Sequence, residues 1–355
     1  MSKIRIGLFG ARMDNTGLGA QTWEFYKHIK PDKTFVIDTS DTHPERKQYW
    51  DRYPEAMACV GTPDVMMITE FLKDLDVVFC METPYNYDLF AFARAMGVKT
   101  ILQYNWEFLD YLQNPNLPIP DLFASPSMWN YNNLPFVNKT FLPVPVNREV
   151  IKFKRRKSIK TILHIAGPKL HADRNGTEIF MRSLPLLDPK LKVIIYTQHK
   201  IEMPELDIKC KVEIRKLDMD NYFDLYKEGD ILVMPRRYGG LCLPLNESMA
   251  AGMIPVMTKI SPQVDILHPM SLIPAFTYKD IETRVTVRAY EISPELLAEK
   301  INHIARCDSD IIENLSEFSN DYAKMIDWNF LEKLYRKIFE TLVEGNNVTP
   351  DKRTD

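Results

Sequence analysis

Apolar runs of strand length alternate with helix-like segments along most of the chain, and this alternation limits the fold more than any other feature. In the first half, helical patterns at residues 20–28, 68–75 and 87–96 separate several of these runs. Strands that are apolar on both faces and separated by helices indicate a parallel sheet covered by helices on both sides. The runs are IRIGLFG, TFVIDT, DVVFCME, TILQYN, LFASPS and KTFLPVP.

The alternation pauses at VNREVIKFKRRKSIK, residues 146–160, and then restarts. This segment is polar and basic, which favours a solvated linker over a phosphate-binding segment. The pattern that follows is KTILHIAG, a helix from Thr177, KVIIYTQ, VEIRKLD, a helix from Asn221, DILVMPR, a helix from Glu247, and IPVMTKI. The 355 residues therefore predict two α/β domains, each a doubly wound Rossmann-like sheet.

Domain limits follow from the same patterns. We expect a Rossmann-like domain at residues 1–146, a linker at 147–159 and a second Rossmann-like domain at 160–325. A final helix at 326–345 and a disordered tail at 346–355 complete the chain. Ligands of such sheets bind at the carboxyl ends of the strands, so two domains should enclose a cleft between them.

Composition narrows the class of protein. A hydrophobic share of 45%, a charged share of 26% and a net charge of -3 are typical of a soluble globular protein. No segment approaches the roughly 20 apolar residues of a membrane helix, so no integral membrane segment is expected. The five scattered cysteines indicate reduced thiols in a cytoplasmic protein. The near-neutral charge gives no support for a protein that lives on nucleic acid.

Two loops that follow first strands have phosphate-binding character. Gly17 and Gly19 precede a predicted helix, where backbone N–H groups can face an anion; a tight strand-to-helix turn is the alternative. Lys169 and Arg174 lie ahead of a helix in the second half of the chain and suit a diphosphate. An ordinary solvated loop is the alternative there.

The stretch YGGLCLPLNESMAAGMIPVM, residues 238–257, places glycines ahead of a helix that we expect to begin at Asn246 or Glu247. Gly239 and Gly240 let backbone amides approach a ligand closely. A carboxylate at Glu247, in the first turn, can accept hydrogen bonds from two ribose hydroxyls. Helix capping is the structural alternative for this glutamate.

The run GGLCLPLNESMAAGMIPVM resembles the nucleotide-sugar signature of GT-B glycosyltransferases, in particular the retaining family 4 and its relatives. The resemblance implies two Rossmann-like domains facing across a cleft, with the final helix packing back on the first domain. It also implies a nucleotide-diphosphate sugar as co-substrate, retention, no cofactor and no metal. Further segments resemble the family in the expected order: LPVPVNREVIKF, LHIAGPKLHADRNG, LDMDNYFDLYKEGDILVMPRR and DWNFLEKLYRKIFETL.

The resemblance implies roles for individual residues. Glu247 would hold the ribose, and the loop of Gly17 and Gly19 would close over the diphosphate from the other domain. The residues expected around the diphosphate are Lys169, Arg174, Arg237, Gly239, Gly240 and Leu241.

This sequence departs from the family pattern at three positions. The first glutamate of the signature would fall at Gly239, which leaves room for an unusual donor. The phosphate-binding cations of the family would fall at Pro168 and Asn175. Lys169 and Arg174, each one residue away, are candidates to replace these cations, and Arg236 or Arg237 could also supply charge.

Acceptor residues are expected at strand ends of the first domain. Glu82, Asn105 and Glu107 are the candidates to position or deprotonate an acceptor hydroxyl. In the family a histidine often follows the strand that corresponds to TILQYN, and this chain has Asn105 there. Whether a side chain of this protein acts as a general base is therefore left open. Asp218 and Asp220 form a DxD pair, for which helix capping is favoured over metal binding.

Several alternatives stay open at this stage. The acceptor could be a glycan, a protein or a modified DNA base, the last as in a phage-type enzyme. A catalytically inactive GT-B module that only binds a nucleotide sugar is a second class of function. A sugar-phosphate isomerase or a phosphorylase on the same fold is a third, although a phosphorylase would need a lysine for pyridoxal phosphate in a suitable context. The expected location is the cytoplasm of a bacterial cell or a phage-infected host.

Overall fold

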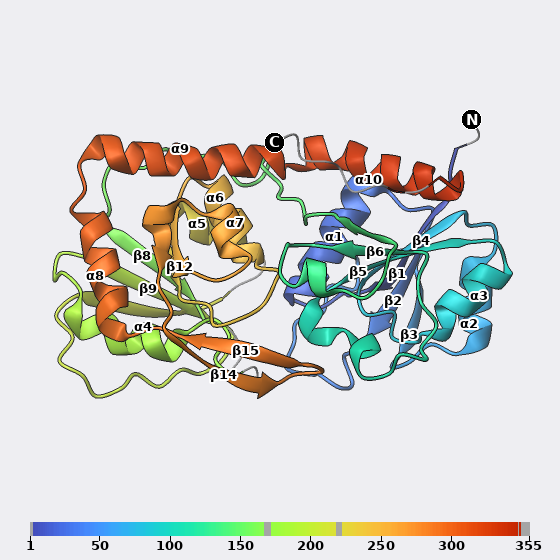
Figure 1. Cartoon of the computed structure of the whole chain (residues 1–355), viewed down its shortest axis with the longest axis horizontal. Helices are drawn as coiled ribbons and strands as arrows, with labels where there is room; N and C mark the ends of the chain where they lie inside the picture. Colours follow the sequence, from blue (N-terminus) through green and yellow to red (C-terminus); the bar gives the residue numbers. More distant parts are fainter. Residues whose placement is uncertain (1–2, 167–171, 218–221, 347, 349–355) are drawn as a thin grey trace. The chain divides into compact units, whose positions relative to one another are not determined.

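The computed structural model describes residues 3–166, 172–217, 222–346 and 348. The chain divides into two compact units (Figure 1). Unit 1 consists of Met1–Val144 and Trp328–Asp355, and unit 2 consists of Pro145–Asp327. Each unit contains a large parallel sheet. Of the helices in the described part of the chain, none combines the length and apolarity that a bilayer-spanning segment needs.

Unit 1 is built on seven parallel strands in the order β3-β2-β1-β4-β5-β6-β7. The order reverses beside β1, because the chain pairs β2 on one side of β1 and later pairs β4 on the other. Such a reversal is the topological switch point at which doubly wound sheets bind ligands. The strands are β1 (Ile6–Ala11), β2 (Lys33–Asp38), β3 (Met57–Val60), β4 (Val77–Glu82), β5 (Lys99–Tyr104), β6 (Leu122–Ser125) and β7 (Lys139–Phe141).

The helices of unit 1 include the last helix of the chain, α10. Its buried residues recur every three or four positions, so it presents one apolar face, and it packs beside α1. The Tyr335 hydroxyl in that face donates to the Pro143 carbonyl (3.1 Å) and accepts from Gln103 Nε2 (3.2 Å). The α-helices are α1 (Gly17–Ile29), α2 (Val65–Leu72), α3 (Asp88–Ala95) and α10 (Trp328–Val343), and the 3₁₀ helices are η1 (Trp106–Phe108), η2 (Asp110–Leu112) and η3 (Tyr131–Asn133).

Unit 2 is built on six parallel strands in the order β10-β9-β8-β11-β12-β13. Its switch point lies between β8 and β11, which are neighbours in the sheet although α4, β9 and β10 separate them in sequence. A two-stranded antiparallel hairpin, β14–β15, follows the sheet. The strands are β8 (Thr161–Ile165), β9 (Lys192–Thr197), β10 (Lys211–Lys216), β11 (Ile231–Met234), β12 (Ile254–Thr258), β13 (Leu272–Ile273), β14 (Thr277–Glu282) and β15 (Thr286–Glu291).

The helices of unit 2 bury its sheet in a core of aliphatic side chains contributed by the central strands, α4, α8 and α9. Within that core, α4 contacts α8. The α-helices are α4 (Thr177–Ser183), α5 (Leu225–Glu228), α6 (Leu243–Ala250), α7 (Gln263–Ile266), α8 (Pro294–Ala305) and α9 (Ser309–Met325), and the 3₁₀ helices are η5 (Leu184–Leu186), η6 (Tyr222–Asp224) and η7 (Pro269–Ser271).

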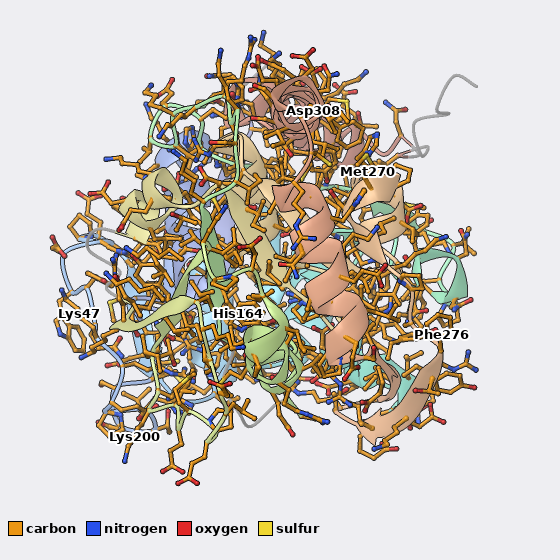
Figure 2. All side chains as sticks on the ribbon, turned by 90° about the vertical axis from the view of Figure 1, so that its left-hand side faces the viewer. Lys47, His164, Lys200, Met270, Phe276 and Asp308 are labelled. Atoms are coloured by element: carbon orange, nitrogen blue, oxygen red, sulfur yellow. The ribbon has the colours of Figure 1, made fainter. Side chains whose placement is uncertain are left out.

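Strands β3 and β13 and the hairpin β14–β15 have no counterpart in the sequence prediction. Strand β3 lies at the edge of its sheet, and its residues alternate between half-buried and exposed, so its apolar run, MACV, is only four residues long and is not buried on both faces. The hairpin β14–β15 is mostly exposed on its first strand, and Phe276, labelled in Figure 2, is exposed just before it. Neither strand has the apolar signal of a central parallel strand.

The segment expected as a linker, residues 147–159, belongs to unit 2. Ile151 and Ile159 are buried there, and so is the Arg156 side chain. The Arg156 guanidinium donates to three backbone carbonyls, those of Lys154, Tyr226 and Gly229. Part of the basic run is therefore embedded in unit 2 and does not lie free in solvent. Most of the predicted tail at 346–355 lies outside the described residues.

Candidate functional site

The loops that follow β8 and β11 meet at the carboxyl edge of the unit 2 sheet. The Arg237 amide donates to the Arg174 carbonyl (2.9 Å), and Arg237 Nη1 donates to the Ala172 carbonyl (2.5 Å). A side chain at Gly176 would begin 2.3 Å from the Pro235 carbonyl oxygen, so a glycine is needed where the two loops touch. The predicted donor residues Arg174, Arg237 and Gly239 are thus brought together at the switch point.

Arg237 is already neutralised by a carboxylate of its own unit. Its Nη2 lies 2.6 Å from Glu291 Oε1, at the end of β15. The Arg237 carbonyl also accepts from the Tyr290 amide (2.9 Å). The arginine therefore ties the hairpin to the loop after β11.

Arg236 has different surroundings, although it is the next residue along the chain. Its side chain is 3% exposed, and its Nε has no hydrogen-bond partner. Its Nη2 lies 3.4 Å from the Tyr238 carbonyl, at the weak end of the range for a hydrogen bond. A β-carbon at Gly239 would lie 2.4 Å from this Nη2 and 3.3 Å from Arg174 Cδ. The guanidinium thus occupies the space beside a glycine whose φ is +108°.

Helix α6 begins at Leu243, so the prediction that it begins at Asn246 or Glu247 is wrong. Pro244 fits the first helical turn, because the missing N–H of proline would have no partner there in any case. Glu247 therefore lies in the second turn and does not cap the helix. Gly240 and Leu241 are half-buried residues between the Gly239 loop and the start of α6.

Glu247 is held by two tyrosines that the sequence analysis did not single out. The residue is 7% exposed, and its Oε2 accepts from the hydroxyls of Tyr222 (2.5 Å) and Tyr226 (2.6 Å). Burial, and then the charge of Glu247, raises the pKa of both phenols well above the ordinary value, so both remain donors. A spacing of four residues on a helical segment puts two side chains on one face, and this signal could have paired them.

Other predicted positions lie outside the described residues. These are Lys169 and the DxD pair of Asp218 and Asp220. Asn175 is described, and its Nδ2 donates to the Ile165 carbonyl (3.1 Å) at the end of β8. No group of three or more His, Cys, Asp and Glu side chains arranged to hold a metal ion occurs among the residues that the structure describes.

The switch point of unit 1 also carries a buried arginine. Arg12 Nη2 forms a salt bridge with Asp14, and it donates to Thr39 Oγ1 (2.8 Å), while Nη1 donates to the Tyr85 hydroxyl (3.0 Å). Arg46 provides a second cation 3.3 Å from Asp14. Burial raises the pKa of Asp14, but the arginines and the Thr16 hydroxyl outweigh burial, so the pKa lies below its ordinary value.

The glycines near the start of α1 are engaged within unit 1. Gly17 is the first residue of the helix, and the Gly19 amide donates to the side chain of Thr16, the N-cap residue (3.2 Å). A β-carbon at Gly19 would lie 2.1 Å from the Asp14 carbonyl oxygen. The glycine at this position is required by a tight turn from β1 into α1, whatever else the loop binds.

Two of the acceptor candidates are in contact. Asn105 Nδ2 donates to Glu82 Oε1 (3.1 Å), and both side chains are half-buried at the carboxyl ends of neighbouring strands. Glu82 and Tyr85 both have a positive φ, 65° and 59°, which is rare for residues with a side chain and forms a sharp turn after β4. Glu107 is buried in η1 at 2% exposure, so solvent does not reach its carboxylate as it reaches Glu82.

Part of unit 2 is similar to a known protein family, and the fold of the chain is similar to solved structures. Residues 159–304 match the family model of group 1 glycosyl transferases. The fold is similar to that of HepE from Anabaena, solved with UDP and glucose, with a TM-score of 0.68 at 9% identity over 96% of this chain and 100% of that one. It is also similar to sucrose-phosphate synthase from Thermosynechococcus elongatus, with a TM-score of 0.68 at 10% identity over 97% and 100% of the two chains.

A glycosyltransferase from Rickettsia africae is similar as well, with a TM-score of 0.67 at 11% identity over 97% of this chain and 100% of that one. A comparison with curated protein sequences found no match. These likenesses confirm the predicted fold class, two Rossmann-like units of the GT-B type.

Proposed function

We propose that this chain is a glycosyltransferase that moves a sugar from a nucleoside diphosphate sugar to an acceptor hydroxyl, because residues 159–304 match the model of group 1 glycosyl transferases and the fold is of the GT-B type. The proposed reaction retains the anomeric configuration and uses neither a metal ion nor a cofactor. The proposed location is the cytoplasm, a compartment in which the three buried free cysteines, Cys80, Cys210 and Cys242, would stay reduced.

The observation that carries this proposal is the buried carboxylate of Glu247 at the edge of the unit 2 sheet. An ionised carboxylate only accepts hydrogen bonds, and it has lone pairs for several donors. Two tyrosine hydroxyls fix one of its oxygens, which sets the orientation of the whole group. A carboxylate fixed in this way suits the two adjacent hydroxyls of a ribose, and the neighbouring Gly239 loop suits the diphosphate that follows the ribose.

The proposed donor is a UDP-sugar. HepE, which shares the fold, has been solved with UDP, with UDP and glucose, and with UDP-glucose. UDP-glucose is therefore the first donor to test. Other bases and sugars follow, because Gly239 stands where the family places a sugar-contacting glutamate.

In the proposed reaction, the bond between the anomeric carbon and the diphosphate oxygen breaks while the acceptor oxygen bonds to the same face of that carbon. The acceptor proton passes to the departing diphosphate oxygen. Protein cations and the amino end of α6 stabilise the charge that develops on the diphosphate. Glu82 and Asn105 in unit 1 are the proposed positioning groups for the acceptor hydroxyl, because they form a half-buried polar pair at strand ends.

The test begins with thermal unfolding in the presence of UDP, other nucleoside diphosphates and their sugars. A ligand that binds only the native state raises stability by about 2.7 kcal/mol at a hundredfold excess over its dissociation constant, which is readily measured. Release of UDP from UDP-glucose, followed with and without glycan, protein or DNA acceptors, then measures turnover. The coupling constant of the anomeric proton in the product reports retention or inversion.

The outcomes separate the alternatives. Turnover with retention supports the full proposal. Binding without turnover for any donor and acceptor favours an inactive binding module. No binding of any nucleotide would overturn the proposal.

A further inference from the structure

Arg236 is a buried cation with no counter-charge among the residues that the structure describes. At 3% exposure it is as buried as Arg156, which is 2% exposed and donates to three carbonyls. Arg236 donates one long hydrogen bond of 3.4 Å, and its Nε has no partner. Within the described ranges, no carboxylate lies at ion-pair distance from it. A charge buried in this way is costly unless a ligand supplies the counter-charge.

The position of Arg236 shows what kind of ligand could supply it. The residue follows β11, which pairs with β8 at the switch point, the place where doubly wound sheets bind ligands. Arg174, from the loop after β8, contributes a side chain that would lie 3.3 Å from a β-carbon at Gly239. Arginine presents a planar fork of N–H donors that matches the oxygens of phosphate and carboxylate groups.

Gly239 is the second part of this arrangement. Its φ of +108° is a conformation that other residues rarely adopt, and any β-carbon would lie 2.4 Å from Arg236 Nη2. Helix α6 begins four residues later, and its N-cap residue, Cys242, makes no side-chain capping bond. Pro244 has no N–H and the Leu245 amide donates to the Cys242 carbonyl (3.0 Å), so the start of α6 favours an anion through the helix dipole. The glycine gives space to the guanidinium, which supplies the hydrogen-bond donors.

We propose that Arg236 is the oxyanion-binding residue of unit 2 and that it takes the diphosphate of the nucleotide donor. The proposal rests on the proposed function. The sequence left this role open between Arg236 and Arg237 and placed Arg237 among the expected donor residues, and the proposal assigns the role to Arg236. Arg237 is paired with Glu291, whereas Arg236 is not paired with any described carboxylate. A carboxylate on the donor sugar could bind Arg236 in the same way as a phosphate oxygen does, so the experiment must distinguish these two anions.

The experiment compares Arg236→Met with a charge-matched control, Arg215→Gln, by calorimetric titration and thermal unfolding. Arg215 lies on the edge strand β10 and pairs with Glu213 and Glu228, so its removal lowers the net charge of the same unit without touching the switch point. The probes are UDP, uridine and inorganic pyrophosphate. For Arg236→Met we expect the Kd of UDP and of pyrophosphate to rise at least tenfold while the Kd of uridine stays within twofold. Arg236→Lys should recover part of the loss.

The stability of the unliganded variant separates a binding role from a structural one. Without ligand, Arg236→Met should unfold at the same temperature as the wild type or at a higher one, because methionine removes an unbalanced buried charge. The UDP-induced rise in Tm should shrink. A lower Tm together with an unchanged ratio of UDP to uridine affinity would overturn the proposal, because Arg236 would then be structural.

The remaining outcomes distinguish this inference from the proposed function. If wild-type protein binds pyrophosphate and Arg236→Met does not, the inference stands even if UDP-glucose is never turned over. If Arg236→Met turns over UDP-glucose with an unchanged KM, the inference fails and the proposed function stands. A loss confined to UDP-glucuronate, with UDP-glucose and UDP unaffected, would overturn the diphosphate assignment and place a sugar carboxylate on Arg236.

Discussion

Both sheets carry a buried arginine at the carboxyl edge of their switch points, but the two arginines are balanced in different ways. Arg12 in unit 1 forms a salt bridge with Asp14, which is 0% exposed, and it also bonds the side chains of Thr39 and Tyr85. Arg236 in unit 2 has one long bond to a carbonyl and no described carboxylate beside it.

We interpret this difference as that between a structural charge, Arg12, and a ligand-binding charge, Arg236, at equivalent places in two similar sheets. The bonds of Arg12 and Asp14 connect the loops after β1, β2 and β4, so they stabilise unit 1 without any ligand. The environment of Arg236 is incomplete without an anion. The surroundings of a buried charge therefore say more about its role than does its place in the fold.

The largest expected effect comes from breaking the balanced site. Asp14→Asn leaves Arg12 buried without its counter-charge, and we expect a loss of about 3–5 kcal/mol in the free energy of unfolding, measured in urea. The double variant Arg12→Met with Asp14→Leu removes both charges and should recover most of that loss. A loss below about 1 kcal/mol for Asp14→Asn would show that the pair is not the structural centre we describe.

Acid should destabilise unit 2 through His164, which is buried in β8 and labelled in Figure 2. Its Nδ1 lies 2.7 Å from the Val233 carbonyl and must donate, so Nε2 accepts from the Thr177 hydroxyl (2.9 Å). Burial lowers the pKa of His164 from 6.5 to about 4. Below pH 6.5 the unfolded chain binds this proton and the folded chain does not, so stability should fall by roughly 3 kcal/mol on reaching pH 4.

The measurement is the free energy of unfolding between pH 7 and pH 4, for the wild type and for His164→Gln. The variant is less stable at pH 7, but the part of the pH dependence that His164 causes should be absent. Identical pH slopes for the two proteins would contradict the assignment. Asp14 acts at lower pH, because its lowered pKa means that its stabilisation is lost only as the pH falls below the ordinary range of an aspartate.

A smaller effect is expected for ligand binding at Glu247. Glu247→Ala should weaken UDP binding by about 1–3 kcal/mol, the scale of a lost charged hydrogen bond. Titration with UDP and with its 2′,3′-dideoxy analogue measures this. The variant should lose affinity for UDP and little for the analogue, whereas equal losses for both would argue against a ribose contact.

A still smaller effect is expected for the tyrosines that hold Glu247. Tyr226→Phe removes one of the tyrosine hydrogen bonds to Oε2 and should weaken UDP binding by about 0.5–1.5 kcal/mol, again with less effect on the dideoxy analogue. Tyr196→Phe is the matched control, because Tyr196 lies on β9 and its hydroxyl also donates to a glutamate, Glu228 of α5 (3.3 Å). An equal change in both variants would mean that the effect is not specific to Glu247.

The smallest expected effect is that of chelation. We expect EDTA to leave turnover of UDP-glucose unchanged within error, because the proposed mechanism stabilises the diphosphate with arginine and backbone groups. Activity that is lost with EDTA and restored by a divalent cation would overturn this part of the proposal. It would also direct attention to the DxD pair, which lies outside the described residues.

The sequence by itself predicted the two doubly wound sheets and the resemblance to GT-B glycosyltransferases, because both depend on local patterns. Continuous apolar strands such as β4 and β11 can be recognised from neighbouring residues in the sequence. The run from Gly239 to Met257, which carries the family resemblance, is also one continuous segment. The start of α6 was misplaced by at least three residues because Pro244 was not recognised as a first-turn residue. Strand β3 was missed because its apolar run, MACV, is only four residues long, and the β14–β15 hairpin was missed because its exposed first strand carries no apolar run.

Only the tertiary structure decided which charges are balanced. Arg236 and Arg237 are adjacent and chemically identical in sequence, and they differ because Glu291 arrives from β15 beside one of them. In the same way, Tyr222 and Tyr226 approach Glu247 from a different helix, and Asn105 approaches Glu82 from a neighbouring strand. These contacts join residues that are distant in sequence, and their distances depend on how the strands and helices pack, so no local pattern could predict them.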